Sequence, residues 1–197
     1  METIEKIKIA VPVNDMRELL NGASVCAYKG KDTTTTLNSV ALSVNGNKLV
    51  ARATDRYRLI EGTLTLESES DLPVTLISLA DVKRVIDLTK GISVGYMVIE
   101  REESERLTVS VNGNSALTIS PVNGNFPTLE NTNQLLAEQV KLEPVGEIAF
   151  NAKFFADFGK ISDRVTMRFT GDRKLINIGL DGNQVTWRAA LMPMRKA

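Results

Sequence analysis

The chain has 197 residues and carries no net charge, because its 24 lysine and arginine residues offset its 24 aspartate and glutamate residues. It contains no histidine and a single cysteine, Cys26. This excludes histidine-based catalytic triads, histidine–metal sites, internal disulfides and cysteine-rich zinc sites. A protein that holds DNA with a wide basic surface is usually basic overall, so action on DNA here requires local positive charge or retention by topology.

The same composition bounds the cellular setting. Hydrophobic residues make up 43% of the chain, which is enough for an ordinary core, and no apolar run is long enough to cross a membrane. The first residues lack a basic segment followed by an apolar one, so we expect no secretory signal. We therefore predict a cytoplasmic protein with no membrane partner, metal, cofactor or catalytic residue.

Three short helical patterns follow one another along the chain, and each is preceded by a short strand. A polar residue that favours helix N-caps opens each pattern: Asn14, Ser78 and Asn151. The predicted helices cover residues 14–20, 78–86 and 151–158. The strands predicted before them cover residues 7–13, 74–77 and 147–150.

Further strands follow each helix, and tight turns separate them. Asn45-Gly46, Asn112-Gly113 and Asp181-Gly182 recur at nearly equal intervals, and such dipeptides suit the positive φ angles of type I′ hairpin turns. The predicted strands cover residues 38–44, 48–53 and 57–66, then 93–100, 106–111 and 115–119, and finally 164–170, 175–180 and 184–192. The unit is one strand, one helix and three strands, repeated three times, which predicts an α+β fold with antiparallel sheets.

Three short segments are more specific than the repeat. Residues 53–59 read Ala-Thr-Asp-Arg-Tyr-Arg-Leu, residues 124–127 read Gly-Asn-Phe-Pro, and residues 191–195 read Leu-Met-Pro-Met-Arg. Together they resemble the pocket and connector motifs of bacterial DNA polymerase sliding clamps, the DNA polymerase III beta subunit family. The resemblance implies a DNA clamp fold with sheets outside and helices lining the inner face.

The resemblance also implies a division of the chain. Residues 1–130 correspond to one clamp domain made of two half-units, about 1–68 and 69–130, and residues 131–197 correspond to a third half-unit that another chain would complete. A bacterial clamp subunit has six half-units, so this chain resembles a short, phage-encoded version. A ring of twelve half-units would then require four chains, which predicts a closed homotetramer.

In that family a groove between domains receives linear peptides from polymerases and the clamp loader. Thr54, Asp55, Arg58 and Leu59 match the family's pattern, whereas Arg56 stands where the family has glycine and Tyr57 where it has histidine. Because glycine suits a turn with an unusual φ, Arg56 predicts a somewhat different local turn. The residues that the resemblance assigns to the pocket are Thr54, Arg56, Tyr57, Arg58, Leu59, Pro127, Leu191, Met192, Pro193, Met194 and Arg195.

The inner face of a clamp faces DNA, and the exposed sides of the three predicted helices would supply cations there. Positive side chains on such a face attract phosphates without reading bases. The same side chains are also typical of an ordinary solvated helix surface with mixed charge. The residues assigned to the DNA-facing surface are Arg17, Lys83, Arg84, Lys90, Lys153 and Lys160.

These assignments predict a sliding clamp, a non-enzymatic processivity factor that encircles double-stranded DNA and binds DNA polymerase and the clamp loader in a bacterial host cell or its nucleoid. A second hypothesis is a clamp-like module that captures peptides as a decoy, or regulates a host clamp, without encircling DNA. A third is an unrelated α+β enzyme that uses aspartate or glutamate. The absence of histidine and of a glycine-rich phosphate loop disfavours the third.

Overall fold

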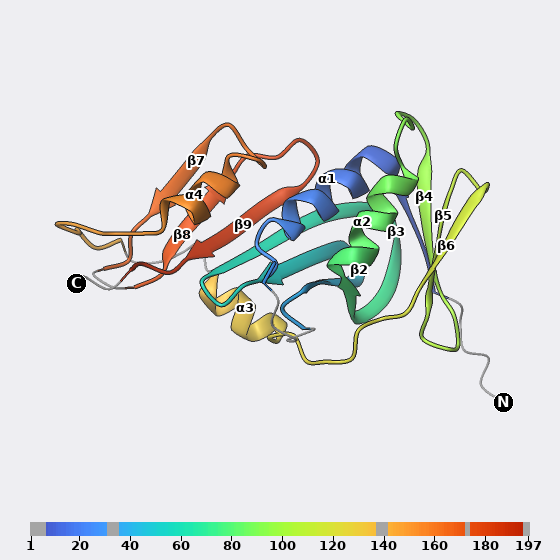
Figure 1. Cartoon of the computed structure of the whole chain (residues 1–197), viewed down its shortest axis with the longest axis horizontal. Helices are drawn as coiled ribbons and strands as arrows, with labels where there is room; N and C mark the ends of the chain where they lie inside the picture. Colours follow the sequence, from blue (N-terminus) through green and yellow to red (C-terminus); the bar gives the residue numbers. More distant parts are fainter. Residues whose placement is uncertain (1–6, 31–35, 137–141, 172–173, 195–197) are drawn as a thin grey trace.

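The computed structural model describes residues 7–30, 36–136, 142–171 and 174–194. Two antiparallel sheets and four helices make up this part of the chain, which confirms the α+β class expected from the sequence. The helices are α1 (Val13–Ser24), α2 (Leu79–Leu88), α3 (Leu129–Leu135) and α4 (Ala152–Phe158). Helices α1, α2 and α4 form a row along the long axis of the molecule, whereas α3 lies apart from them (Figure 1).

The smaller sheet joins the beginning of the chain to its middle. Its strands are β1 (Lys8–Pro12), β4 (Tyr96–Arg101), β5 (Leu107–Val111) and β6 (Ser115–Ile119), in the order β1-β4-β5-β6. The hairpin between β5 and β6 turns at Asn112 and Gly113, whose φ angles of 50° and 74° fit a type I′ turn. The hairpin predicted from this dipeptide is therefore confirmed.

The larger sheet joins early and late parts of the chain. Its strands are β2 (Ser39–Thr54), β3 (Arg58–Ser78), β7 (Val165–Arg168), β8 (Ile176–Leu180) and β9 (Thr186–Leu191), in the order β2-β3-β9-β8-β7. β2 and β3 each span two of the predicted strands. β2 continues through Gly46, which has a φ of 58°, and its pairing with β3 shifts register there. β3 pairs with β9, beginning with Arg58 opposite Leu191.

Side-chain caps start two of the three predicted helices. The Ser78 hydroxyl accepts a hydrogen bond from the N–H of Asp81 at 3.1 Å, and Asn151 Oδ1 accepts one from the N–H of Lys153 at 3.0 Å. Such bonds satisfy N–H groups that the first turn of a helix leaves without partners. Both caps were predicted from the sequence.

The cap predicted at Asn14 is wrong. Helix α1 begins at Val13, directly after β1, so Asn14 lies inside the first turn. Its side chain instead donates a hydrogen bond to the carbonyl of Ser93 at 2.9 Å, which ties α1 to the loop before β4. The N-cap position of α1 is Pro12, whose side chain has no polar atom to accept a hydrogen bond from the first turn.

Helix α3 follows the connector motif at residues 124–127, where the sequence predicted no helix. The hydroxyl of Thr128 caps it by accepting a hydrogen bond from the N–H of Asn131 at 3.3 Å. Threonine at this place with Glu130 in the first turn is a recognised helix start signal. Leu136, just after the helix, packs with Leu59 and Ala190 of the larger sheet. The helix thereby covers the sheet where β3 meets β9.

No strand forms over residues 147–150, although the sequence predicts one there. In this segment the carbonyl of Ala149 accepts a hydrogen bond from the N–H of Met194 at 2.7 Å. Apolar alternation predicted the strand, but a strand also needs a neighbouring chain for its backbone groups. The prediction is wrong for this reason.

A large apolar core lies between the helices and both sheets. It includes Leu19 and Leu20 of α1, Val85 of α2 and Phe158 of α4, all nearly or completely buried. Burying one large apolar side chain contributes about 1.5–3 kcal/mol, so this core dominates the stability of the fold. It also fixes the positions of the strand ends that form the site described below.

Candidate functional site

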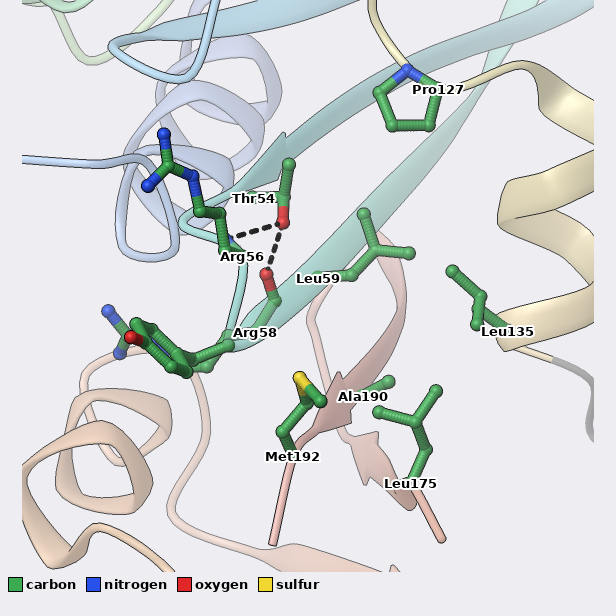
Figure 2. A pocket seen from close by; sticks show the side chains of 10 residues that line it. Thr54, Arg56, Arg58, Leu59, Pro127, Leu135, Leu175, Ala190 and Met192 are labelled. Carbon is green, nitrogen blue, oxygen red and sulfur yellow. Dashed lines mark hydrogen bonds between the residues drawn. The ribbon is translucent and has the colours of Figure 1, made fainter. Parts of the chain in front are cut away.

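The turn between β2 and β3 is held by two short polar side chains. Thr54 Oγ1 donates a hydrogen bond to the carbonyl of Arg58 at 2.6 Å and accepts one from the N–H of Arg56 at 3.2 Å (Figure 2). Asp55 Oδ1 accepts hydrogen bonds from the N–H groups of Tyr57 at 3.0 Å and Arg58 at 2.8 Å. Short polar side chains stabilise tight turns in this way. The turn is therefore fixed by its own sequence.

Arg58 fastens this turn to α4. Its guanidinium donates two hydrogen bonds to Asp55 Oδ2, at 2.9 and 2.8 Å, and one to Asp157 Oδ2 at 2.7 Å. The guanidinium carbon also lies 4.4 Å from the ring centre of Phe154, a distance typical of a cation–π contact. Because Arg58 is only 6% exposed, these contacts offset the cost of burying its charge.

Asp157 connects the buried arginine to the surface. Burial raises the pKa of Asp157, but hydrogen bonds from Lys160 and Arg58 outweigh that effect and hold the pKa below its usual range. The carboxylate therefore stays ionised at neutral pH. It joins α4 to the turn through charge as well as packing.

The segment directly after β9 lies beside the same turn. The N–H of Met192 donates a hydrogen bond to the carbonyl of Tyr57 at 2.8 Å. The Tyr57 ring stacks on Phe154, with 5.7 Å between ring centres and 26° between planes. Met192 and Met194 are 48% and 55% exposed. Exposed apolar side chains gathered at one place mark a binding surface.

A cavity of about 240 Å³ lies between the turn that joins β2 to β3 and the segment that begins at Met192, and these form its two walls. The side chains of Leu59, Leu135 and Leu175 point toward it, whereas the guanidinium groups of Arg56 and Arg58 point away (Figure 2). An apolar cavity with polar groups confined to one edge is typical of a site that takes an apolar ligand group. The residues that line it are Thr54, Arg56, Tyr57, Arg58, Leu59, Pro127, Leu135, Leu175, Ala190 and Met192.

Most residues assigned to the pocket from the sequence meet at this cavity. The assigned residues that line it are Thr54, Arg56, Tyr57, Arg58, Leu59, Pro127 and Met192. Leu191 does not line it, because it is completely buried in the core. Pro193 and Met194 follow Met192 but are not part of the lining, and Arg195 lies outside the described residues. Peptide binding at this cavity stays a prediction.

Sequence reasoning missed three of the lining residues. Ala190 lies two places before Met192, so the alternation of side chains along a strand could have placed both on one side. Leu135 belongs to α3, which was not expected, and Leu175 precedes β8. No local pattern relates these two leucines to the turn, because only the packing of distant segments brings them together.

Arg56 takes the backbone conformation that favours glycine. Its φ is 77°, in the left-handed region, so arginine keeps a conformation that suits glycine, and a turn different from the family's stays a prediction. This conformation costs a side-chain-bearing residue about 1–2 kcal/mol. The hydrogen bonds of Thr54 and Asp55 described above hold the turn in place despite that cost.

Three of the predicted DNA-facing cations form ion pairs on α2 and the turn after it. Lys83 and Lys90 contact Asp87 at 2.8 and 2.7 Å, and Arg84 contacts Asp81 at 2.7 Å. Hydrogen bonds from Lys83 and Lys90 lower the pKa of Asp87 to about 2, so this carboxylate is charged at neutral pH. The surface of α2 therefore presents charges of both signs, and its contact with DNA stays a prediction.

The two predicted cations of the α4 region differ from each other. Lys160 forms an ion pair with Asp157, the carboxylate that also binds Arg58. Lys153 is exposed in the first turn of α4. A cation in the first turn gains nothing from the helix dipole, so its charge is directed to solvent or to a partner. The role of both residues toward DNA stays a prediction.

Arg17 has a structural role between the first two helices. Its guanidinium donates hydrogen bonds to the carbonyls of Thr89 at 2.6 Å and Ile92 at 2.7 Å. These carbonyls lie in the turn that follows α2. Arg17 therefore joins α1 to the end of α2, and its assignment to the DNA-facing surface is not tested.

The middle of the chain matches a protein-family model. Residues 23–128, more than half of the chain, match the family model described as DNA polymerase III beta subunit, central domain. The chain belongs to this family. The resemblance drawn from the pocket and connector motifs is thus confirmed. No curated protein sequence matches this DNA polymerase III beta subunit family member.

Solved structures show that this family member has the clamp fold. The DNA polymerase sliding clamp of Pseudomonas aeruginosa is 16% identical, with a TM-score of 0.79 over 96% of this chain and 67% of that one. The DNA polymerase III beta subunit of Thermotoga maritima is 17% identical, with a TM-score of 0.79 over 97% and 66%. A putative beta subunit from Eubacterium rectale is 11% identical, with a TM-score of 0.79 over 98% and 67%. The chain spans about two thirds of these clamps.

Membrane-spanning helices and metal sites are absent from the part of the chain that the structure describes. None of its helices has the length and apolar character to span a bilayer. No group of three or more cysteine, aspartate or glutamate side chains is placed there to hold a metal ion.

Proposed function

We propose that this protein is a DNA sliding clamp, a processivity factor that encircles double-stranded DNA and binds peptides of DNA polymerase and the clamp loader. The observation that carries the proposal is the convergence of the turn at residues 54–59 and Met192 on one apolar cavity, in a member of the DNA polymerase III beta subunit family. The role is mechanical rather than catalytic. The clamp would hold a polymerase near DNA without taking part in a chemical step.

The cavity favours a short linear peptide with one or two large apolar side chains. Its lining of leucine, alanine and methionine offers contact without strict shape, because a methionine side chain adapts to different neighbours. Tyr57, which is 57% exposed, adds a flat ring with a polar tip. The Arg56 guanidinium points away from the cavity, where it could meet an acidic residue of the peptide (Figure 2).

The proposal includes an assembly. Residues 1–130 form one clamp domain, residues 131–197 form a third half-unit, and four chains close a ring. Strands β6 and β7 are edges of the two sheets in the described structure, and closed assembly removes such edges. The residues that would then face DNA phosphates are Arg17, Lys83, Arg84, Lys90, Lys153 and Lys160.

Peptide binding tests the pocket. The probe is a fluorescent peptide that carries the apolar clamp-binding motif of a bacterial polymerase, followed by anisotropy. A chain that ends at Leu191 keeps β9 but lacks Met192, so we expect its affinity to fall at least about tenfold, or 1.4 kcal/mol. The Val94→Ala variant is the matched control, because Val94 is an exposed apolar residue that does not line the cavity. Unchanged binding after truncation would contradict the pocket assignment.

Retention on DNA tests encirclement. A closed ring loaded on a nicked circular plasmid should elute with the plasmid through gel filtration in high salt. Linearising the plasmid should release it, because a ring held by topology slides off free ends. Release from both forms at the same salt would contradict encirclement.

A second candidate is a clamp-like module that binds the same peptides but never encircles DNA, acting as a decoy or as a regulator of a host clamp. The ion pairs of Lys83, Arg84 and Lys90 on α2, with zero net charge overall, favour it. Paired cations leave less excess charge for phosphates. Peptide binding without retention on circular DNA would support this candidate.

A further inference from the structure

The segment that enters α4 differs from the strands that enter α1 and α2. β1 runs directly into α1 and pairs with β4, the strand that follows α2. The end of β3 runs directly into α2 and pairs with β2, the strand that follows α1. In the first two half-units, the strand that enters each helix therefore pairs with a strand that follows the other helix. No strand forms over residues 147–150, which run into α4, and β7, the strand that follows α4, is an edge of its sheet.

Equivalent apolar side chains are less buried in the third half-unit, around α4, than in the first half-unit, around α1. The apolar positions four and two places before α1, and three places after its start, are Ile9, Val11 and Met16, with exposures of 2%, 1% and 1%. The residues at the same distances from the start of α4 are Ile148, Phe150 and Phe155. These three are only partly buried. In the first half-unit the two strand positions, Ile9 and Val11, lie opposite Ile99 and Met97 of β4.

We propose that two copies of this chain complete each other here, with residues 147–150 of each copy pairing antiparallel with β7 of the other. One two-fold axis makes both contacts at once, so a second copy satisfies the segment and the edge together. The chain between α3 and α4 is too short to supply another strand–helix unit itself. This pairing specifies the ring assembly proposed above, but it does not require that the protein encircle DNA.

The open edge of the segment faces the right way for this pairing. Met194 donates its N–H to the carbonyl of Ala149. In the proposed pair residues 147–150 form a strand, and neighbouring carbonyls of a strand point to opposite edges. The carbonyls of Ile148 and Phe150 would then lie on the edge opposite Met194, where β7 of the other copy pairs.

The pairing of β1 with β4 serves as the template for the register between residues 147–150 and β7. In that template, residues opposite each other have their side chains on the same buried face. The register that keeps apolar faces together places Phe150 opposite Val165 and Ile148 opposite Met167. Val165 and Met167 both pack against the main apolar core. Apolar side chains opposite one another on one face stabilise an antiparallel pair.

The same register brings opposite charges together. It places Glu147 opposite Arg168. At the corresponding place in the first pair, Lys8 lies opposite Glu100, with 3.7 Å between Lys8 Nζ and Glu100 Oε1. Both pairs join one acidic and one basic side chain, but the acidic residue precedes the helix in the proposed pair and the basic residue precedes it in the first. Apolar and charged positions therefore select one register.

Charge reversal tests the register. Glu147→Arg or Arg168→Glu alone places like charges opposite each other on both sides of the two-fold axis, which is destabilising. We expect each variant to have a lower molar mass by light scattering than the wild type at the same concentration. An equimolar mixture of the two variants restores opposite charges at both places, so its mass should return to the wild-type value. Glu103→Arg, on the exposed turn after β4, is the matched control and should keep the wild-type mass.

Disulfide cross-linking gives a second measurement that does not depend on electrostatics. The register places Ala149 opposite Thr166, so a mixture of the Ala149→Cys and Thr166→Cys variants should form a covalent pair of chains on mild oxidation. Each variant alone should form none. Cys26 does not compete, because burial raises the pKa of its thiol to about 12 and keeps it protonated.

The outcomes separate this pairing from the proposed clamp function. A wild-type chain that stays at 21.6 kDa at high concentration would overturn the pairing. The pairing would also be overturned if the cysteine variants formed no cross-link and the charge-reversed variants kept the wild-type molar mass. Cross-linked pairs that are not retained on circular DNA would support the pairing and contradict encirclement. Retention on circular DNA without a cross-link would contradict the pairing alone.

Discussion

The two walls of the cavity are built in different ways. At the turn, buried Arg58 binds Asp55 and Asp157, so side-chain charge fixes the shape of that wall. At the other wall, Met192 is attached by its backbone N–H, and its side chain is 48% exposed. A rigid wall can set the entrance of a site, while a flexible thioether adapts to what enters. Changes in the first wall should therefore affect folding, and changes in the second should affect binding.

The largest effect should come from breaking the buried charge at the turn. Asp55→Ala removes two hydrogen bonds to Arg58 and two to turn N–H groups, so we expect a loss of about 3–5 kcal/mol in the free energy of unfolding, measured in urea. Asp163→Ala, at an exposed position, should change it by less than about 0.5 kcal/mol. A loss below about 1 kcal/mol for Asp55→Ala would show that the wall does not depend on this charge.

A smaller effect should follow from the outer end of the same network. Asp157→Asn leaves Arg58 bound to Asp55, so we expect a loss of about 1–3 kcal/mol at neutral pH. The folded pKa of Asp157 lies below its ordinary value of 3.8, so its contribution is present above that pH and is lost as pH falls through the folded pKa. The difference between wild type and variant should shrink below about pH 4 in urea titrations. A difference that persists at the lowest pH would contradict the ionic origin.

The flexible wall should respond in binding and not in folding. Met192→Ala removes an exposed side chain from the cavity, so we expect about tenfold weaker peptide binding with a stability change below about 1 kcal/mol. Anisotropy and urea unfolding on the same sample measure both. Equal losses in affinity and stability would erase the distinction between the two walls.

The smallest effect should come from relieving strain at the turn. Arg56→Gly removes the side chain from a residue with φ of 77°, so we expect a gain of up to about 1 kcal/mol in the free energy of unfolding. Arg56→Ala is the matched control, because alanine keeps the strain and should give no gain. Equal effects of the two variants would indicate that charge, not backbone conformation, explains the change.

Local signals predicted much of this molecule. The cap at Ser78, the hairpin at Asn112 and the turn at residues 54–59 depend on residues close in sequence, and each is found in the structure. The strand predicted at residues 147–150 failed for the opposite reason. Its apolar alternation matches that of β1, but a strand forms only where another strand accepts its backbone hydrogen bonds. Pattern alone cannot report whether that neighbour is present.

The sequence by itself determined the α+β class, the family and the rigid turn of the site. Each follows from neighbouring residues or from a short motif. Only the tertiary structure decided that β3 pairs with β9, because this contact joins segments far apart in the chain. It also placed Leu135 and Leu175 in the cavity and Arg58 against Asp157. Such contacts depend on how sheets and helices pack, which local propensity does not encode.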